Sequence, residues 1–283
     1  MKLVIVYNPN CYGWKERYDL LVESAEKFNL VPVGVSIFDF DDEDRISELT
    51  SEKHLIVIVG YPCKDKFFQV LNHNSVTFHS NLFDVFCGDF SMDCFLDFLD
   101  LPYIKTVYKS LFKQYNLSLE SISDYLGGFP IVLKRSGLSK GEGVFKVDDM
   151  NQLRSMVDLF DIENYNYSFK EFYPHTAQGR VIMVGREYVS GHLNVVGEDF
   201  RSNVGESSDR IRENHVFKPE LLNYISSVDN KIVAEFSGYD LLYGVDGTYK
   251  ICEKNSPCNF TMTQKMTNVS ISDKLIQLLL KNV

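Results

Sequence analysis

Several features that mark particular protein classes are missing from this sequence of 283 residues. No stretch approaches the roughly 18 apolar residues that a membrane-spanning helix needs. The opening segment, Met1–Tyr7, has one basic residue and a short apolar run, without the longer apolar region and cleavage site of a signal peptide. We therefore expect a cytoplasmic protein that has no membrane partner.

Cysteine pairs with metal-binding spacing and an excess of basic residues are also missing. The six cysteines are scattered, and none belongs to a Cys-x-x-Cys pair or to a Cys/His cluster with zinc spacing. This pattern favours reduced thiols of a cytosolic protein over disulfides or metal ligands. The formal net charge of −10 disfavours nonspecific binding to nucleic acid, so we expect no nucleic-acid partner.

The first hundred residues alternate between strand and helix patterns. Hydrophobic residues make up 45% of the chain, which is enough for a sizeable core. Leu3–Tyr7 and Leu30–Phe38 are predicted strands, and Trp14–Phe28 has helical spacing. Leu55–Val59 is wholly apolar, which predicts a buried parallel strand. We predict a small open α/β domain over residues 1–92.

The rest of the chain predicts a central domain at 93–166 and a strand-rich C-terminal domain at 167–283, so the fold class is α/β (α+β). Asp246-Gly247 is a strong hairpin turn in the last domain. Further strands are predicted at Phe129–Arg135, Gly143–Val147, Tyr167–Phe172, Val181–Val184, Tyr188–Leu193, Tyr239–Tyr243 and Thr248–Glu253. Further helices are predicted at Cys94–Leu101, Lys105–Tyr115, Gln152–Phe160, Pro219–Phe236 and Ser272–Leu280.

A glycine-rich loop, Gly137–Gly143, lies between two predicted strands. A P-loop or a dinucleotide fingerprint needs a helix directly after its glycines, so this loop belongs to neither class. Its backbone N–H groups could close over a phosphate chain as a hairpin flap, and a plain hairpin loop fits the pattern about as well. Lys134, late in the preceding apolar strand, favours the flap, because lysine is rarely buried without a partner. A surface lysine on an edge strand is the alternative.

Three oxygen-bearing side chains are predicted to converge on one face of the last hairpin. Asp240 lies in one strand and can face Glu253 in the next, and Asn255 projects from the same face as Glu253. Such ligands suit Mg²⁺, which is usually shared with substrate phosphates. A glutamate that bridges two ions would serve a phosphoryl-transfer site. The alternative is a solvated polar face of the sheet.

In their order and spacing, these segments resemble the ATP-grasp ligases, above all the RimK-like glutamate ligases and D-alanine–D-alanine ligase. The resemblance runs from about Asp93 to the end and covers the N-terminal domain more loosely. It is carried by Phe129–Lys134 with the glycine loop, Lys170–Phe172, Asp199–Asn203, Tyr239–Leu242 and Glu253–Pro257. It implies an ATP-grasp fold in which central and C-terminal ATP-grasp domains follow an N-terminal open α/β domain.

The resemblance also implies a role for each matching residue. ATP would be bound by Lys134, by Lys105 at the start of a helix (with Lys109 as its rival), by Ser139, Lys140, Gly141 and Gly143 of the flap, and by the adenine-reading hinge Glu171, Phe172 and Tyr173. Arg180, Arg201 and Asn203 match the catalytic positions near the γ-phosphate and the acyl intermediate. Asp240, Glu253 and Asn255 match the metal ligands. The implied cofactors are ATP and Mg²⁺, with two ions, and Mn²⁺ as a substitute.

Three positions depart from the family pattern. Gln178, which we include among the ATP-binding residues, stands where an acidic residue often contacts the ribose. Cys258 replaces the glycine that follows Glu253–Pro257, and His192–Asn194 stands in place of a basic run. These departures argue against a simple transfer of RimK's substrate. Substrate contacts are predicted at Cys11–Trp14, Tyr61–Cys63 and Glu206–Asn214, because specificity in such folds depends on loops.

The implied chemistry is activation of a carboxylate by ATP. An acylphosphate and ADP form first, and an amine then attacks to give an amide bond and phosphate. The partners would be a small carboxylate and a small amine, or a peptide, and a homodimer is the default assembly. Two alternatives stay open: a ligase for a nucleophile other than an amino acid, and an ATP-binding module without activity. A dinucleotide-binding oxidoreductase is disfavoured, because Asn8-Pro9-Asn10 lacks the glycine pattern.

Overall fold

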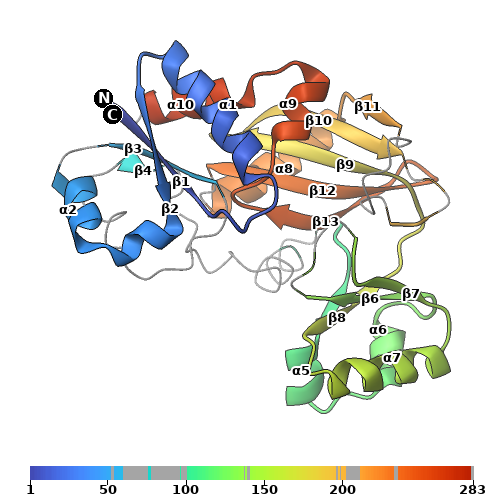
Figure 1. The fold of residues 1–283 in the computed structure, drawn as a ribbon. Helices are drawn as coiled ribbons and strands as arrows, with labels where there is room; N and C mark the ends of the chain where they lie inside the picture. Colours follow the sequence, from blue (N-terminus) through green and yellow to red (C-terminus); the bar gives the residue numbers. More distant parts are fainter. Residues whose placement is uncertain are drawn as a thin grey trace.

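The computed structural model describes residues 1–51, 54–59, 76–77, 96, 101–136, 138, 141–195, 197, 199–201, 211–232 and 235–281. Three β-sheets form within these residues, and helices cover part of their faces (Figure 1). This mixture of helices and sheets confirms the predicted α/β (α+β) class. No helix in this part of the chain is long and apolar enough to cross a membrane. Tyr61–Cys63 and most of Cys94–Leu101 lie outside the described residues.

The N-terminal sheet is parallel, as the continuous apolar run at Leu55–Val59 predicted. Its strands, in spatial order, are β2 (Val31–Ser36), β1 (Lys2–Tyr7), β3 (Leu55–Val59) and β4 (Val76–Thr77). One face packs against α1 (Trp14–Lys27) and α10 (Ile271–Lys281), and the other against the 3₁₀ helix η1 (Ile37–Asp41) and α2 (Glu43–Ser51). The strand predicted at Leu30–Phe38 ends at Ser36, because the Ser36 side chain accepts a hydrogen bond from the Phe38 N–H and caps η1.

The central sheet is antiparallel and has helices on one face. Its strands, in spatial order, are β5 (Thr106–Tyr108), β8 (Tyr167–Glu171), β6 (Ile131–Arg135) and β7 (Val144–Val147). The helices are α5 (Lys109–Gln114), α6 (Leu119–Tyr125) and α7 (Met150–Ile162). The prediction of a helix from Lys105 is wrong for its first residues, because Thr106–Tyr108 pair with β8. Since β8 completes this sheet, we propose that the domain boundary lies after Glu171 instead of after residue 166.

The C-terminal sheet is also antiparallel. Its strands, in spatial order, are β11 (Arg212–Asn214), β10 (Glu187–Val195), β9 (His175–Val184), β12 (Phe236–Gly244) and β13 (Tyr249–Asn255). Helix α8 (Pro219–Ile232) covers one face, and α9 (Thr261–Thr267) and α10 cover part of the other. The helix predicted at Pro219–Phe236 ends at Ile232, because Phe236 already begins β12 and packs against Phe260. Sequence periodicity missed α6 and α9, each of which has only 7 residues.

The face of the C-terminal sheet opposite α8 is apolar and covered at one end of its strands, and polar and open to a cleft farther along them. Ile182 and Phe236 join the core around α1 and α10, so this end of the face is covered. Gln178, Arg180 and Asp240 lie farther along the same strands and face a cleft instead. The central sheet stands across this cleft, and the chain crosses between the two sheets just before β9 (Figure 1). The fold thus leaves polar side chains of two sheets facing each other.

Candidate functional site

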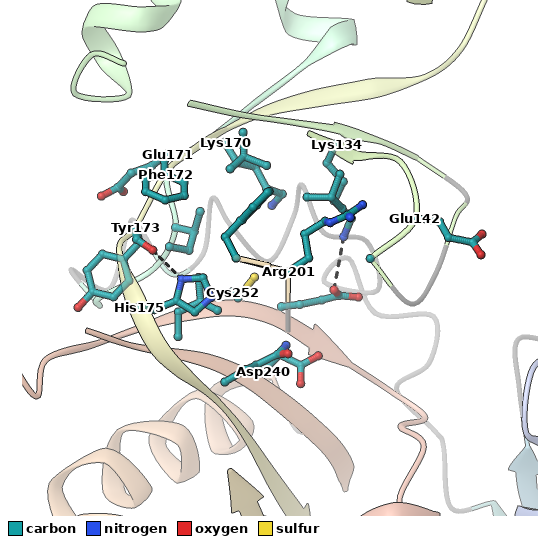
Figure 2. A pocket seen from close by; sticks show the side chains of 18 of the residues that line it. Lys134, Glu142, Lys170, Glu171, Phe172, Tyr173, His175, Arg201, Asp240 and Cys252 are labelled. Carbon is teal, nitrogen blue, oxygen red and sulfur yellow. Dashed lines mark hydrogen bonds and ion pairs between the residues drawn. The ribbon is translucent and has the colours of Figure 1, made fainter. Parts of the chain in front are cut away.

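The cleft between the central and C-terminal sheets has a cavity volume of about 320 Å³ (Figure 2). This volume lies at the lower end of the range of about 300–1,000 Å³ that small-molecule sites occupy. Of the residues predicted to bind ligands, the cleft is lined by Lys134, Gly141, Glu171, Phe172, Tyr173, Gln178, Arg180, Arg201, Asp240, Glu253 and Asn255. Gly143 and Lys105 do not line it. Ser139, Lys140 and Asn203 lie outside the described residues.

The roof of the cleft is the face of the central sheet that points away from its helices. Ile131 of β6 and Phe169 of β8 are fully buried in the core on the helix side. Because side chains alternate along a strand, Lys134 and Lys170 point to the opposite face and line the cleft. The Nζ atom of Lys134 lies 3.5 Å from Oε2 of Glu253, so the roof touches the floor through this ion pair (Figure 2).

Lys105 points away from the cleft, and the same alternation explains why. Thr106 and Lys170 are cross-strand partners, so Thr106 shares the cleft face. Val107, on the other face, is buried among the helices. Lys105 precedes Thr106, and its Nζ lies 5.4 Å from the centre of the Tyr125 ring on α6. Its rival Lys109 forms an ion pair at 3.1 Å with a carboxylate of α7 and does not line the cleft.

The floor of the cleft holds two carboxylates, an amide and a guanidinium on three neighbouring strands. Nε of Arg180 lies 2.8 Å from Oδ1 of Asp240, and Nδ2 of Asn255 donates a hydrogen bond to Oδ2 of Asp240 at 3.4 Å. Glu253 is the cross-strand partner of Asp240, as predicted. Burial raises the pKa of Asp240 to about 6, with Arg180 opposing the shift and Glu253 adding to it. Burial lowers the pKa of Arg180, but the electrostatic effects of Asp240, Cys258 and Glu253 together outweigh burial, and the pKa is raised.

A β-bulge at Cys252 sets which side chains of β13 face the cleft. Leu241 pairs with Ile251, while the adjacent Asp240 pairs with Glu253, so Cys252 is the extra residue. Ile251 packs in the core under α8, and regular alternation would direct Glu253 to that core as well. With the bulge, Cys252 and Glu253 both line the cleft. Burial raises the pKa of the Cys252 thiol to about 11, so it stays protonated at neutral pH.

The hinge residues Glu171–Tyr173 are held by side-chain contacts to the last hairpin. The Glu171 carboxylate forms an ion pair with Lys250 and accepts a hydrogen bond from the backbone N–H of Lys105 at 3.3 Å. The Tyr173 hydroxyl contacts the hydroxyl of Thr248, beside the Asp246-Gly247 turn. These contacts fix the position of the segment that joins the two sheets, and with it the width of the cleft.

The glycine loop closes a hairpin between β6 and β7. The N–H of Arg135 donates to the carbonyl of Gly143 at 2.8 Å. Gly143 has a φ of +69°, and a Cβ there would lie 2.7 Å from Cδ1 of Leu138 and 3.0 Å from Cβ of Arg135. The backbone conformation therefore favours glycine, and any larger residue would also have to displace the Leu138 side chain. Leu138, Gly141 and Glu142 line one side of the cleft.

Arg201 reaches the cleft from the segment after β10. Its guanidinium donates three hydrogen bonds to Asp199, from Nη2 to Oδ2 at 2.6 Å and from Nε to Oδ1 at 3.0 Å and to Oδ2 at 3.1 Å. The hydrogen bonds that the guanidinium donates to Asp199 raise the pKa of Arg201. Phe200, between them, packs edge-on against Phe172 of the hinge at 5.9 Å between ring centres. The segment is thereby anchored to the hinge side of the cleft.

The family described as the RimK-like ATP-grasp domain matches residues 94–279. This chain belongs to the RimK-like ATP-grasp family. The resemblance inferred from its motifs is thereby confirmed. The probable alpha-L-glutamate ligase of Trichodesmium erythraeum (strain IMS101) is 26% identical over 177 residues, which are 61% of this chain and 58% of that relative. The chain thus spans less than two thirds of that relative's length.

Solved structures share the fold of this ATP-grasp protein over its whole length. The D-alanine–D-alanine ligase from Bacillus anthracis complexed with ATP aligns with a TM-score of 0.68 and 15% identity, over 99% of this chain and 96% of that chain. The macrocyclase MdnC bound with precursor peptide MdnA from Microcystis aeruginosa MRC aligns with a TM-score of 0.70 and 11% identity, over 100% of both chains. The predicted ATP-grasp fold is confirmed.

The donor set of the floor fits the magnesium ion that ATP-grasp proteins use with ATP. No group of three His, Cys, Asp or Glu side chains placed to hold a metal occurs in the described part of the chain. The floor offers instead the two carboxylates of Asp240 and Glu253 and the amide of Asn255. Oxygen donors of this kind, fewer than a full coordination shell, suit a magnesium ion that shares phosphate oxygens. A cation between the buried carboxylate of Asp240 and the half-buried carboxylate of Glu253 would also relieve their mutual repulsion.

Sequence reasoning used Lys170 only as part of a matching segment and gave it no role. It lines the cleft, and only 7% of its surface is exposed. A lysine directly after Phe169, inside a short predicted strand, was the available signal. The signal could not be used without knowing which face of β8 is covered by helices.

Proposed function

We propose that this chain is an ATP-dependent carboxylate–amine ligase, which forms an amide (peptide) bond through an acylphosphate and releases ADP and phosphate. Membership of the RimK-like ATP-grasp family supports this activity. The observation that carries it is the ion pair between Lys134 of the roof and Glu253 of the floor, beside Asp240 and Arg180. Cations and oxygen donors from two sheets converge at one point, as the transfer of a phosphoryl group requires.

Several residues of the cleft have a proposed part in binding ATP. Glu171–Tyr173 reads the adenine, and Gln178 lies where it can reach the ribose. Lys134 neutralises phosphate oxygens. Asp240, Glu253 and Asn255 hold magnesium, two ions in the proposed arrangement, and the metal supplies further neutralisation of the phosphates. Gly141 and its neighbours in the flap limit the access of water.

In the proposed reaction, the two arginines of the cleft act on the group that is transferred. A substrate carboxylate oxygen attacks the γ-phosphorus of ATP, the bond to ADP breaks, and an acylphosphate forms. Arg180 and Arg201 stabilise the negative charge on this group, with Asn203 beside them. An amine then attacks the acyl carbon, phosphate leaves, and the amine loses a proton. The enzyme positions the partners and excludes water, because water would hydrolyse the acylphosphate.

The substrate is proposed to carry fewer acidic groups than a poly-glutamate acceptor. His192, in place of the family's basic run, is only 5% exposed, and its Nδ1 lies 3.0 Å from the Thr263 hydroxyl. Burial, with Arg180 and Arg212 nearby, lowers the pKa of His192 to about 4. The imidazole is therefore neutral at pH 7 and offers no cation to an acidic chain. An amino acid, a small peptide or a peptide segment fits this environment.

The test measures ADP release from Mg²⁺-ATP with a panel of amino acids, dipeptides and peptides, with mass spectrometry of the products. A carboxylate and an amine that together provoke ADP release, and a product whose mass is their sum less water, are the expected result. Glu253→Gln should lower turnover at least a hundredfold while the protein remains folded. Binding of ATP without turnover on any substrate pair would favour the silent ATP-binding module instead. Undiminished magnesium-dependent turnover in Glu253→Gln would refute the metal assignment.

A further inference from the structure

Lys170 is a buried cation for which the described residues provide no counter-charge. Only 7% of its surface is exposed. Its Nζ donates a hydrogen bond to Oγ1 of Thr106 at 3.0 Å, and this partner is neutral. Among the residues that the structure describes, no carboxylate forms an ion pair with Lys170, whereas Lys134 is paired with Glu253. A buried ammonium group without an anion is unfavourable, so its retention calls for an anion from outside the chain.

The register of the central sheet shows where that anion would lie. Val132 of β6 is the cross-strand partner of Lys170, and Lys134 follows two residues later on the same face. Lys134 and Lys170 are therefore diagonal neighbours on adjacent strands, within reach of one another's ligands. Figure 2 shows both side chains in the roof of the cleft. Two ammonium groups this close repel each other unless a polyanion binds between them.

We infer that Lys170 is a phosphate-binding residue, and that it supplies the second lysine of the nucleotide site in place of Lys105. This inference rests on the proposed function, since the polyanion is the phosphate chain of ATP. Phosphate fits better than a substrate carboxylate for two reasons. Lys170 directly precedes the hinge Glu171–Tyr173, and it shares its face with Lys134, so both lysines lie on the roof, across the cleft from Arg180 of the floor.

The strand order explains how Lys170 can take the role that the resemblance implied for Lys105. Lys105 adjoins Thr106 in sequence, and Lys170 adjoins Thr106 across the sheet. Alternation sends the neighbour in sequence to the helix side, where Lys105 lies near Tyr125. The cross-strand neighbour shares the cleft face with Thr106. Lys170 of β8 can therefore supply a lysine to the cleft beside Thr106, although Lys105, which precedes β5, points away from the cleft.

The experiment compares nucleotide binding by calorimetry for the wild type, Lys170→Met, Lys105→Met and Thr106→Val. The ligands are Mg²⁺-ATP, Mg²⁺-ADP and adenosine. Because a hydrogen bond to a charged group is lost, Lys170→Met should bind Mg²⁺-ATP and Mg²⁺-ADP about ten- to a hundredfold more weakly. Adenosine should bind the wild type and Lys170→Met with equal affinity, because it carries no phosphate. Lys105→Met, a matched control at an exposed position on the helix side of the sheet, should bind every ligand like the wild type.

A second measurement separates phosphate binding from a structural role. Without nucleotide, Lys170→Met should unfold at a temperature equal to or above that of the wild type, because an uncompensated buried charge is removed. Thr106→Val removes the hydrogen bond and should leave affinity within about threefold. If Lys170→Met unfolds earlier and Thr106→Val reproduces its loss of affinity, the lysine is structural and the inference is wrong. If Lys170→Met does not fold, Lys170→Arg replaces it in the experiment, because arginine keeps the positive charge. Lys170→Arg should bind Mg²⁺-ATP with near wild-type affinity. A loss of affinity as large as that predicted for Lys170→Met would count against the inference.

The outcomes distinguish this inference from the proposed function. If the wild type does not bind Mg²⁺-ATP, the proposed function fails and the inference fails with it. If the wild type binds Mg²⁺-ATP and Lys170→Met binds it equally well, only the inference is refuted. An equal loss for adenosine would show that Lys170 supports the adenine pocket and does not bind phosphate.

Discussion

The contact between Gly238 and Cys258 provides a sharp test of how this chain accommodates its departure from the family motif. A Cβ added at Gly238 would lie 2.6 Å from Cβ of Cys258 and 2.9 Å from its Sγ. Carbon atoms normally approach to about 3.5–4.0 Å, so the neighbours would have to move by about 1 Å. Overpacking of this kind in a core costs about 1–3 kcal/mol. Gly238→Ala should therefore lower the free energy of unfolding by that amount.

The partner residue decides whether the clash can be removed. Cys258 is 1% exposed, and Cys258→Gly should by itself cost about 2 kcal/mol, through lost burial and a more flexible backbone. In the double variant both contacts to Cys258 are gone and only Nη1 of Arg180 remains close, at 3.0 Å, so its stability should nearly match or exceed that of Cys258→Gly alone. The coupling energy is then about 1–3 kcal/mol. Cys258→Ala should not rescue Gly238→Ala, because its Cβ remains in the closest contact.

Urea unfolding of the four proteins in this cycle, together with Cys258→Ala and the Gly238→Ala/Cys258→Ala double variant, measures these energies. Gly238 pairs with Asn255 in the sheet, so binding of Mg²⁺-ATP is measured in parallel. The wild type and Cys258→Ala should bind it alike, and Gly238→Ala more weakly. Additive energies in the double variant would show that the steric explanation is mistaken, as would a full rescue of Gly238→Ala by Cys258→Ala.

Two further predictions concern stability. Asp229 is fully buried and accepts hydrogen bonds from Ser237 Oγ at 2.6 Å and from Tyr239 OH at 2.7 Å. Asp229→Ala leaves these two buried donors unpaired and should lower the free energy of unfolding, measured in urea, by about 3–5 kcal/mol. The exposed Asp158→Ala is its control and should change stability by less than about 0.5 kcal/mol; a similar small change in Asp229→Ala would contradict the reasoning. In the folded chain the pKa of His192 is lowered from 6.5 to about 4. As the pH falls from 6.5 towards 4, protonation therefore favours the unfolded chain and the free energy of unfolding decreases, whereas above pH 6.5 this group does not change it. The wild type should lose about 3 kcal/mol over this interval relative to His192→Gln, and parallel pH curves for the two would rule out this assignment.

Much of the candidate site could be predicted from local sequence patterns. Glu253 and Asn255 are two residues apart, and Asp246-Gly247 before them marks a hairpin that brings Asp240 opposite Glu253. Both inferences depend on neighbouring residues and on the period of a strand. The order of the motifs then identified the ATP-grasp family before any contact was known. Such patterns can be recognised in the sequence because each strand or turn is formed by residues that are close together in the chain.

The role of Lys170 and the outward direction of Lys105 could not be predicted in the same way. Each depends on whether residues 106–108 form a strand, and that was decided by pairing with β8, about 60 residues later. A lysine at the end of a short strand has no strong preference for either face of the sheet. Only the helices packed on one side of the central sheet determine which side chains remain free for a ligand.

The sequence alone determined that oxygen donors, lysines and a glycine loop would be placed on adjacent strands in an ATP-grasp order, because hydrophobic period and turn residues act over a few positions. Tertiary structure decided which of those side chains meet. The bulge at Cys252 shifts the alternation of β13 so that Glu253 faces the cleft beside Asp240 and not the core beside Ile251. Lys134 reaches Glu253 from another sheet 119 positions earlier in the chain. Such contacts arise from how two sheets pack, and no local pattern of residues encodes that packing.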